Sequence, residues 1–323
     1  MASNVLVTGS SGYLGRVLVA RLLSHPEVQR VVGLDAAPSS VVHPKFKHYG
    51  GDIRDEFYLR SLLQEEKIDT IFHLAFIMGE PRDHALAMSV NVGGTLTVLE
   101  AASKSVSVRK LVISGSASAY GARSNNPKFL SEDRPLRART LRYGVYKREV
   151  EEQLAKAIPE ARKDLQVTIL RVCTIVGSSA RGKGPVTTFC ELPCGVSVLF
   201  RKGGLQFIHE DDLMDVMLRV MQTPSFRGIY NVAPDDCTTI AALCRKMGKP
   251  RLAAPYSALW LAFFLARRLL RRSDVTENVV SYLAYPVVLS NQKIKRDLGV
   301  SFKRGSEEAF LECARALNVG HQL

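Results

Sequence analysis

Short runs of β-branched and aliphatic residues alternate with helix-period segments through the first half of the chain. Amphipathic segments separate these apolar runs, which include residues 4–8, 30–35, 69–75, 109–114 and 166–170. Such alternation is typical of βαβ units, and runs that lack a polar face indicate a parallel sheet with helices on both sides. The pattern therefore predicts an α/β fold with a doubly wound parallel sheet.

The pattern becomes less regular after about Val172, where Gly- and Pro-bearing stretches begin. One further strand is expected at 228–232, and the rest of the chain is mostly helical. These changes predict a first domain and a smaller, mostly helical lobe. The first domain is assigned residues 1–172 plus about 205–233, and the lobe is assigned about 173–204 plus 234–323.

An apolar segment at 256–266 ends in a cluster of arginines, which are Arg267, Arg268, Arg271 and Arg272. The segment is much shorter than the ~20 residues that are needed to span a bilayer. We favour a helix whose apolar side packs on the lobe or covers a pocket, since helices in folded lobes are commonly this apolar. The alternative is an interfacial helix at a membrane surface.

The chain has 323 residues, of which 46% are hydrophobic and 23% are charged, as in ordinary globular proteins. Its formal charge is +13, and residues 240–323 contribute +8 because they hold 14 Lys and Arg against 6 Asp and Glu. A basic surface favours anionic partners, such as a phosphorylated substrate or a membrane surface. Nucleic acid is not an expected partner, because no recognition motif accompanies the charge.

The six cysteines lack the paired spacing of a metal site, and Cys190 and Cys194 are the only close pair. We therefore expect small buried thiols and no metal. The N-terminus passes from Met1 directly into a strand-like run, without the pattern of a secretory signal. We expect a cytoplasmic protein.

The sequence TGSSGYLG at Thr8–Gly15 lies between the first strand and the first helical segment. Glycines there allow a tight turn, a close approach of the backbone to a pyrophosphate, and packing of the helix on the strand. The helix N-terminus then favours negative charge. The context predicts a Rossmann-type dinucleotide site, with contacts from Gly9, Ser11, Gly12, Tyr13, Leu14 and Gly15.

Asp35 ends the second strand, twenty residues beyond Gly15, where a carboxylate can accept hydrogen bonds from the adenosine ribose. It would repel a 2′-phosphate, and Ala36–Pro38 supply no arginine, so NAD is predicted rather than NADP. A simple turn cap is the alternative role. Asp52 and Ile53 follow the third strand and are expected to flank the adenine, although a Gly-Asp turn without a ligand role is the competing interpretation.

Tyr143 and Lys147 lie four residues apart at the start of a predicted helix, so they project from one face. A tyrosine acting as a base near neutrality needs its pKa of ~10 lowered by about 3, which is roughly 4 kcal/mol. We expect the lysine charge to lower it. Ser116, at the end of the fifth strand, can hold the reacting oxygen, since ligands bind at that edge of a doubly wound sheet.

Taken together, these motifs resemble the extended short-chain dehydrogenase/reductase family of the NAD-dependent epimerase/dehydratase type. The family includes nucleotide-sugar epimerases, dehydratases and hydroxysteroid dehydrogenases. Further matching stretches are His73-Leu74-Ala75, Asn91-Val-Gly-Gly-Thr95, Tyr120-Gly121, Leu170-Arg171, Phe207–Asp212 and Tyr230–Val232. The resemblance implies cofactor contacts at Leu74, Ala75, Asn91, Tyr143 and Lys147, and substrate contacts at Ser116, Ser118 and Thr174. It also implies a homodimer formed through helices corresponding to 85–104 and 143–157.

Departures from the family pattern disfavour some of the reactions and substrates that the family uses. The dehydratases carry an Asp-Glu pair after the serine, whereas this chain has Ala117-Ser118-Ala119. Leu205 stands where an arginine usually clamps the substrate diphosphate, and Thr174 stands where an asparagine is common. Loss of the arginine weakens pyrophosphate binding and favours a substrate that lacks this group.

Three functions remain open from the sequence. The leading one is an NAD-dependent epimerase or dehydrogenase with reversible hydride transfer at a secondary alcohol or ketone of a sugar-like substrate, nucleotide sugars included. The second is a hydroxysteroid- or lipid-type dehydrogenase, suggested by Leu205 and the segment 256–272. The third, a non-catalytic NAD-binding regulator, is disfavoured because Ser116, Tyr143 and Lys147 are all present.

Overall fold

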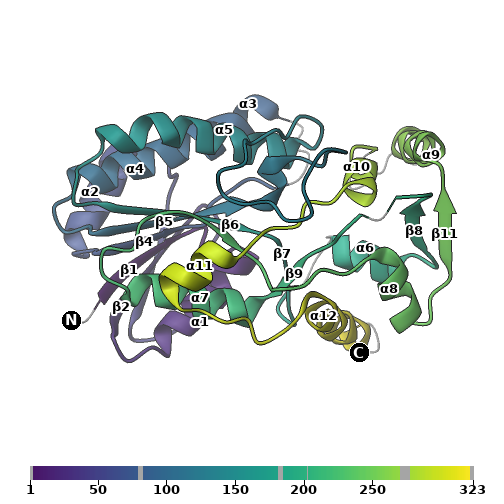
Figure 1. Cartoon of the computed structure of the whole chain (residues 1–323). Coiled ribbons are helices and arrows are strands. Elements are labelled where there is room, and N and C mark those ends of the chain that lie inside the picture. The colour runs from purple at the N-terminus through teal and green to yellow at the C-terminus, as the bar shows by residue number, and fades with distance from the viewer. Residues whose placement is uncertain (1–2, 79–82, 181–184, 202, 270–276, 321–323) are drawn as a thin grey trace. The chain divides into compact units, whose positions relative to one another are not determined.

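The computed structural model describes residues 3–78, 83–180, 185–201, 203–269 and 277–320 (Figure 1). Contacts within the chain divide it into two compact units. The first unit comprises Met1–Gly115, Tyr146–Arg171 and Met214–Tyr230, and the second comprises Ser116–Val145, Val172–Leu213 and Asn231–Leu323.

Residues 116–145 group with the second unit, although the sequence pattern places them in the first domain. Hydrogen bonds explain the grouping, because Leu130 N–H donates to the Val288 carbonyl at 2.7 Å and Ser290 N–H donates to the Leu130 carbonyl at 2.8 Å. The Asn126 side chain also donates to the Pro286 carbonyl at 2.9 Å. This long connection after the fifth strand is therefore tied to the C-terminal part of the chain.

A seven-stranded sheet forms the centre of the first unit, with the order β10-β6-β5-β4-β1-β2-β3. Its strands are β1 (Ser3–Thr8), β2 (Val28–Asp35), β3 (Phe46–Gly50), β4 (Thr70–His73), β5 (Lys110–Ser116), β6 (Gln166–Val172) and β10 (Gly228–Val232). The β1–β2, β1–β4, β2–β3 and β4–β5 pairs are parallel. The predicted doubly wound α/β fold is confirmed, and the chain changes direction across the sheet between β1 and β4, where ligands bind in such folds.

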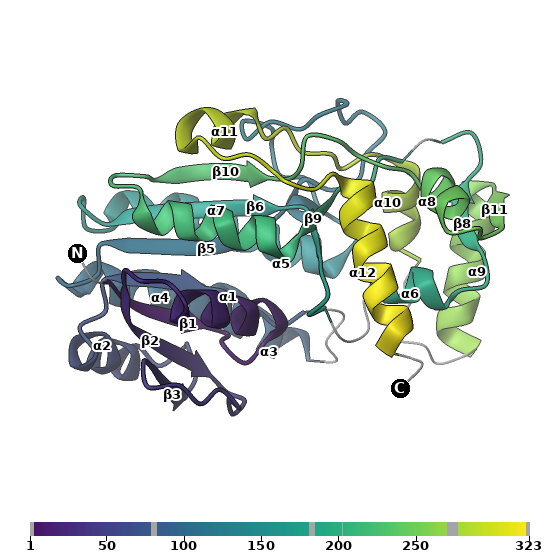
Figure 2. The same ribbon diagram turned by 90° about the horizontal axis from the view of Figure 1, so that it is seen from below.

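Helices cover both faces of this sheet (Figures 1 and 2). On one face lie α2 (Glu56–Glu65), α4 (Thr95–Lys104) and α5 (Arg142–Ala157), and on the other lie α1 (Tyr13–Leu23) and α7 (Glu210–Gln222). The first layer packs its leucines and valines on the apolar strand residues, and Leu6, Leu62, Leu63, Val98 and Leu154 are all buried there. Strands that are apolar on both faces thus bury both faces, as the sequence pattern predicts.

One helical stretch, His84–Lys104, is long and apolar enough to cross a membrane by length and composition alone. It joins α3 (His84–Met88), a π-helical turn at Ser89–Gly94, and α4. Its α4 part buries Val98, Leu99, Ala101 and Ala102 in the core of the sheet. A helix that packs against a sheet in this way is as apolar as a membrane span, so its composition is explained by its place in the core.

The second unit contains two small parallel sheets that the sequence pattern does not predict. They pair β7 (Thr174–Val176) with β9 (Phe207–His209), and β8 (Gly195–Val198) with β11 (Arg251–Ala254). Strands of three or four residues are too short to establish a period-2 pattern. The helices are α6 (Pro185–Glu191), α8 (Ile240–Lys246), α9 (Tyr256–Leu269), α10 (Val279–Ala284), α11 (Gln292–Leu298) and α12 (Ser306–Gly320).

Aromatic rings and small side chains form the core of the second unit. The Phe310 ring of α12 lies 5.4 Å from the Phe189 ring and 4.9 Å from the Phe207 ring, centroid to centroid. Cys244 and Cys313 are buried in the same cluster, as expected for thiols used in packing. Cys190 and Cys194 are free and partly buried.

A buried ion pair joins α5 to β6 inside the first unit. Arg171 Nε donates to Glu151 Oε2 at 2.8 Å, and the two side chains are only 5% and 3% exposed. Burial raises the pKa of Glu151, whereas the Arg171 charge opposes that rise. Each charge therefore depends on the other for compensation.

Removing one partner of this pair should destabilise the protein strongly. We expect Arg171→Met to lower the free energy of unfolding by about 3–5 kcal/mol, because Glu151 stays buried without its cation. The double variant with Glu151→Gln should recover part of the loss. Lys104→Met, which removes ion pairs with Glu100 and Glu56 at the surface, should change stability by less than about 1 kcal/mol. Urea unfolding measures all three, and equal losses in Arg171→Met and Lys104→Met would contradict this account.

Candidate active site

The glycine loop after β1 has the shape that the sequence predicts. Gly9 has φ of 71°, and a Cβ there would lie 2.7 Å from the Ala75 backbone. A Cβ on Gly15 would lie 2.1 Å from the Gly9 carbonyl oxygen, and Gly12 N–H donates to that oxygen at 3.1 Å. The loop therefore accepts only glycine at positions 9 and 15, and it leads directly into the N-terminus of α1, which favours negative charge.

Asp35 connects the glycine loop to the end of β2. Its Oδ2 accepts from Ser11 N–H and its Oδ1 accepts from Ala37 N–H, both at 2.9 Å. The carboxylate thus organises the turn, as the alternative interpretation of the sequence requires. It also stands beside the loop, at the position where a ribose would be held.

An arginine lies closer to this site than the sequence suggests. Arg16, in the first turn of α1, donates to the Ser11 carbonyl at 2.7 Å. Together with Ser11 and Pro38–Ser40 it lines a small cavity in the first unit. Ala36–Pro38 supply no arginine, as the sequence shows, and α1 brings Arg16 to this place from a segment that precedes Asp35.

A buried histidine joins the ends of β1 and β4 to α4. His73 Nδ1 lies 2.7 Å from Thr8 Oγ1, and its Nε2 lies 2.9 Å from Thr95 Oγ1. Thr95 donates to the Asn91 carbonyl at 2.6 Å, so the Thr95 oxygen accepts from the histidine ring. Burial, with a smaller contribution from the Lys147 charge, lowers the pKa of His73 to about 3. His73 is therefore a neutral structural link.

The Asn91 side chain holds the loop that follows β4. The Asn91 side chain accepts from Ile77 N–H at 2.7 Å and donates to the Ile77 carbonyl at 3.1 Å. Leu74 and Ala75 follow β4 directly, and their backbone limits the space at Gly9. The structure thus places Asn91 as a support of the loop that follows β4.

The two residues expected beside the adenine have other partners. The Asp52 carboxylate accepts from the Arg54 guanidinium at 2.5 and 3.0 Å, and this contact lowers the pKa of Asp52. Ile53 is buried, and its side chain occupies the space beside Gly94. These contacts fit the competing interpretation of a turn at Asp52, and the expected contacts of Asp52 and Ile53 with an adenine stay a prediction.

Ser116 and Tyr143 come together in the second unit. Ser116 ends β5, and its Oγ accepts from Ser118 N–H at 3.2 Å, which caps a short 3₁₀ helix. A side-chain hydrogen bond joins Ser116 to Tyr143, in the first turn of α5. Gly144 permits this approach, because a Cβ there would lie 2.6 Å from the Ser118 carbonyl oxygen. The sequence expectation that these hydroxyls share a site is thus supported by geometry.

Lys147 lies one helical turn after Tyr143 and is buried in the first unit. Its Nζ donates to the Ser114 carbonyl at 2.6 Å and lies 3.8 Å from the centre of the Phe76 ring. Burial lowers the pKa of Lys147 to about 7, and the Glu151 charge opposes that change. The ammonium is thus directed at the end of β5, two residues before Ser116.

The acidity of Tyr143 differs from the sequence expectation. Burial raises the pKa of Tyr143 in the protein alone, and the Ser116 hydrogen bond opposes that rise. The net shift of this pKa is therefore upward, opposite to the lowering that the sequence predicts, and the Lys147 ammonium donates to the Ser114 carbonyl. A phenol that is protonated at neutral pH can act as an acid, and its use as a base requires additional positive charge nearby.

Residues expected to contact the substrate lie in the second unit. Ser118 is partly buried, and its carbonyl accepts from the Tyr282 hydroxyl of α10 at 3.1 Å. Thr174 is exposed on β7. Leu205 is partly buried against the aromatic core of this unit, so no positive charge is presented from that position.

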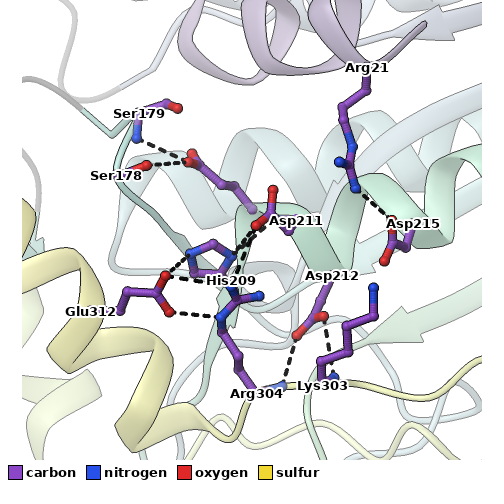
Figure 3. Close-up of polar contacts among 11 residues, drawn as sticks. Arg21, Ser178, Ser179, His209, Asp211, Asp212, Asp215, Lys303, Arg304 and Glu312 are labelled. Atoms are coloured by element: carbon purple, nitrogen blue, oxygen red, sulfur yellow. Dashed lines mark hydrogen bonds and ion pairs between the residues drawn. The ribbon is translucent and has the colours of Figure 1, made fainter. Parts of the chain in front are cut away.

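Polar side chains of the stretch Phe207–Asp212, at the start of α7, contact residues near the start of α12 (Figure 3). Asp212 accepts from Lys303 N–H at 3.3 Å and Arg304 N–H at 3.2 Å. The Arg304 side chain donates to Glu312 at 2.7 Å, and buried His209 lies 3.6 Å from the same carboxylate. These contacts fix α12 and the segment before it, so the motif is structural.

Comparison with known families and proteins agrees with this geometry. Residues 5–233 match the model of the NAD dependent epimerase/dehydratase family. An uncharacterised protein of Mycobacterium tuberculosis is 28% identical over 313 residues, covering 95% of this chain and 82% of that protein. UDP-glucose 4-epimerase of Lactobacillus helveticus is 34% identical over 184 residues, covering 55% of this chain and 53% of that enzyme.

Two solved structures are similar over the whole chain. The Bordetella bronchiseptica enzyme WbmG in complex with NAD and UDP has a TM-score of 0.76 and 21% identity, with coverage of 99% of this chain and 95% of that one. UDP-glucose 4-epimerase of Thermotoga maritima with UDP-glucose has the same TM-score and identity, with coverage of 98% and 99%. At this identity the likeness establishes the fold.

Substitution of Gly9 tests the glycine loop. Gly9→Ala places a methyl group 2.7 Å from the Ala75 backbone on a residue with φ of 71°. We expect at least a tenfold loss of NAD affinity and a stability loss of more than about 1 kcal/mol. Gly50→Ala, where a Cβ meets nothing within 4 Å, is the matched control and should bind NAD normally. Calorimetric titration with NAD checks both, and equal affinities would refute the assignment.

The buried lysine should make stability depend on pH. Because the pKa of Lys147 is about 7 in the folded protein and ~10.4 in an unfolded chain, the folded state binds this proton more weakly. Burial of the charged lysine therefore lowers the free energy of unfolding by its full amount below about pH 7. This loss disappears as pH rises to about 10. Lys147→Met should be more stable than wild type at neutral pH, by up to about 4 kcal/mol, with a smaller difference at about pH 10. Urea unfolding at several pH values checks this, and parallel curves would contradict it.

Proposed function

Because the chain belongs to the NAD dependent epimerase/dehydratase family, we propose that it catalyses reversible hydride transfer at a secondary alcohol or ketone of a sugar-like substrate. The observation that carries this proposal is the hydrogen bond between Ser116 and Tyr143, with Lys147 one helical turn away. A purely structural role would not require two hydroxyls and a buried ammonium at the carboxyl end of a parallel strand.

The residues of the glycine loop fit the cofactor of this family. Gly9 and Gly15 leave a backbone cradle that any Cβ would fill, and α1 begins at its edge. The pyrophosphate of NAD would lie at this helix N-terminus, and Asp35 would accept from the adenosine ribose. When bound, NAD supplies the site that accepts and returns a hydride.

Three side chains would orient the reacting oxygen, transfer its proton and stabilise the charge that develops. Ser116 Oγ orients the substrate oxygen, and Tyr143 Oη takes its proton as the alcohol is oxidised and returns it in the reverse direction. Lys147 Nζ adds positive charge near the phenol, where it favours the ionised form. Burial opposes ionisation of Tyr143, so the phenol should become a base only in the loaded site.

The residues that follow Ser116 and the similar enzymes both bear on the reaction and the substrate class. Ala117-Ser118-Ala119 offers no carboxylic acid beside Ser116, so elimination of water lacks its acid and base. Similarity to UDP-glucose 4-epimerases supports a sugar-like substrate, nucleotide sugars included. Epimerisation and simple dehydrogenation both use the same three residues.

A lipid-type alcohol is the second candidate substrate class. It is favoured by the side chain of Leu205, which is packed on an apolar core and presents no guanidinium for a diphosphate. A panel of sugars, nucleotide sugars and sterols, tested by cofactor absorbance, separates the two classes. Turnover of sterols alone would favour the second.

Replacement of the phenol tests the proposal. Tyr143→Phe should reduce turnover by at least a thousandfold while NAD affinity stays within about twofold, since the ring remains and only the proton carrier is lost. Tyr146→Phe is the matched control, because the Tyr146 hydroxyl lies 2.8 Å from His84 Nδ1 and is given no role in the proposed reaction. Steady-state turnover and NAD titration provide the readouts. Undiminished turnover in Tyr143→Phe would show that another residue is the base.

The absorbance of the purified protein distinguishes the two reactions. An epimerase should retain NAD and show no net reduction with substrate, because the hydride returns to the same molecule. A dehydrogenase should accumulate NADH at 340 nm under the same conditions, on the order of one per turnover.

A further inference from the structure

Helix α9 presents an apolar face that nothing among the described residues covers. Leu261, Leu265 and Leu269 follow one another at four-residue spacing and are 51%, 43% and 75% exposed. Trp260 lies beside this stripe, is 39% exposed, and stacks on Phe264 with ring centroids 5.3 Å apart. Large exposed apolar groups gathered on one helix face mark an interaction surface.

The opposite side of α9 is anchored in the second unit. Leu259 is buried in a cluster with Val198, Val280 and Ala284, and Phe263 packs against the same cluster. Figure 1 shows α9 beside α10 and the β8–β11 pair. The sequence expectation of a helix packed on the lobe is correct for this side, whereas the leucine stripe remains outside it. The fold therefore holds the stripe in a fixed position.

The sequence that contains the helix is mainly basic, although Arg267 pairs with Glu277 at 3.5 Å and Lys246 with Glu307 at 3.6 Å. Residues 237–272 contain no Asp or Glu and eight basic residues, which are Arg245, Lys246, Lys249, Arg251, Arg267, Arg268, Arg271 and Arg272. Arg268 is exposed in the last turn of α9, and its guanidinium lies 5.6 Å from the centre of the Phe264 ring. Guanidinium groups at the end of an aromatic and leucine stripe match the boundary between lipid chains and anionic headgroups.

We propose that the exposed face of α9, defined by Trp260, Leu261, Leu265, Arg268 and Leu269, docks on an anionic phospholipid bilayer. The helix has 14 residues, too few to span a bilayer, so it lies in the plane of the interface. A second copy of this chain would bring the same basic charge and be repelled. Nucleic acid would leave the leucines without a partner, whereas a lipid surface accepts both the leucines and the arginines.

Binding to vesicles tests this surface directly. The intact protein should sediment with vesicles of phosphatidylcholine and phosphatidylglycerol, and at least tenfold less with phosphatidylcholine alone. High salt should weaken binding, because the attraction is partly electrostatic. Trp260 is the single tryptophan of the chain, so its emission should shift to shorter wavelength on binding.

Variants separate the apolar and basic contributions. Leu261→Glu with Leu265→Glu should lower vesicle affinity at least tenfold, and Arg268→Glu should lower it several-fold. Val42→Glu with Val106→Glu is the matched control, because these residues are 97% and 91% exposed outside α9, and it should bind like wild type. NAD binding by every variant verifies that the protein is folded, independently of the proposed reaction.

Three results would overturn the proposal. The first is the absence of sedimentation and of any emission shift with anionic vesicles. The second is full binding by the leucine double variant. The third is a concentration-dependent dimer that shifts the Trp260 emission without lipid and is abolished by the leucine substitutions, which would assign the face to a second copy of the chain.

Discussion

The hydrogen bond from the Lys147 ammonium to the Ser114 carbonyl is the contact on which the candidate site depends. At 2.6 Å it joins α5 to the end of β5, where Ser116 follows two residues later. One turn earlier on the same helix, Tyr143 meets Ser116, and Gly144 leaves room for that approach. The two hydroxyls are thus joined in the second unit, and the ammonium is held at β5 in the first unit, one helical turn further along α5.

A buried positive charge constrains the residues around it. Glu151 opposes the effect of burial on Lys147, and Arg171 in turn compensates Glu151. His73 remains neutral for the same reason, since burial and the Lys147 charge both disfavour a second cation. This arrangement should reduce stability at neutral pH, because a lysine is held where its charged form is disfavoured.

Much of the fold and the central site can be predicted from the sequence, because apolar strands, the glycine loop and the four-residue spacing of Tyr143 and Lys147 are local patterns. Contacts between distant segments cannot be predicted in this way. Arg16 comes near the end of β2 only through the placement of α1, and the Ile53 side chain packs beside Gly94. The lowered acidity of Tyr143 likewise follows from burial, which spacing does not reveal.

The central claim is that Lys147 supports ionisation of Tyr143 when the cofactor is bound, and titration of the phenol by ultraviolet difference absorbance tests it most directly. Wild type, Tyr143→Phe and Lys147→Met would each be titrated with saturating NAD. The account predicts a tyrosine that ionises below its ordinary pKa of ~10 in wild type, is absent in Tyr143→Phe, and ionises at higher pH in Lys147→Met. Identical titrations of wild type and Lys147→Met, with no phenol ionising early, would contradict it.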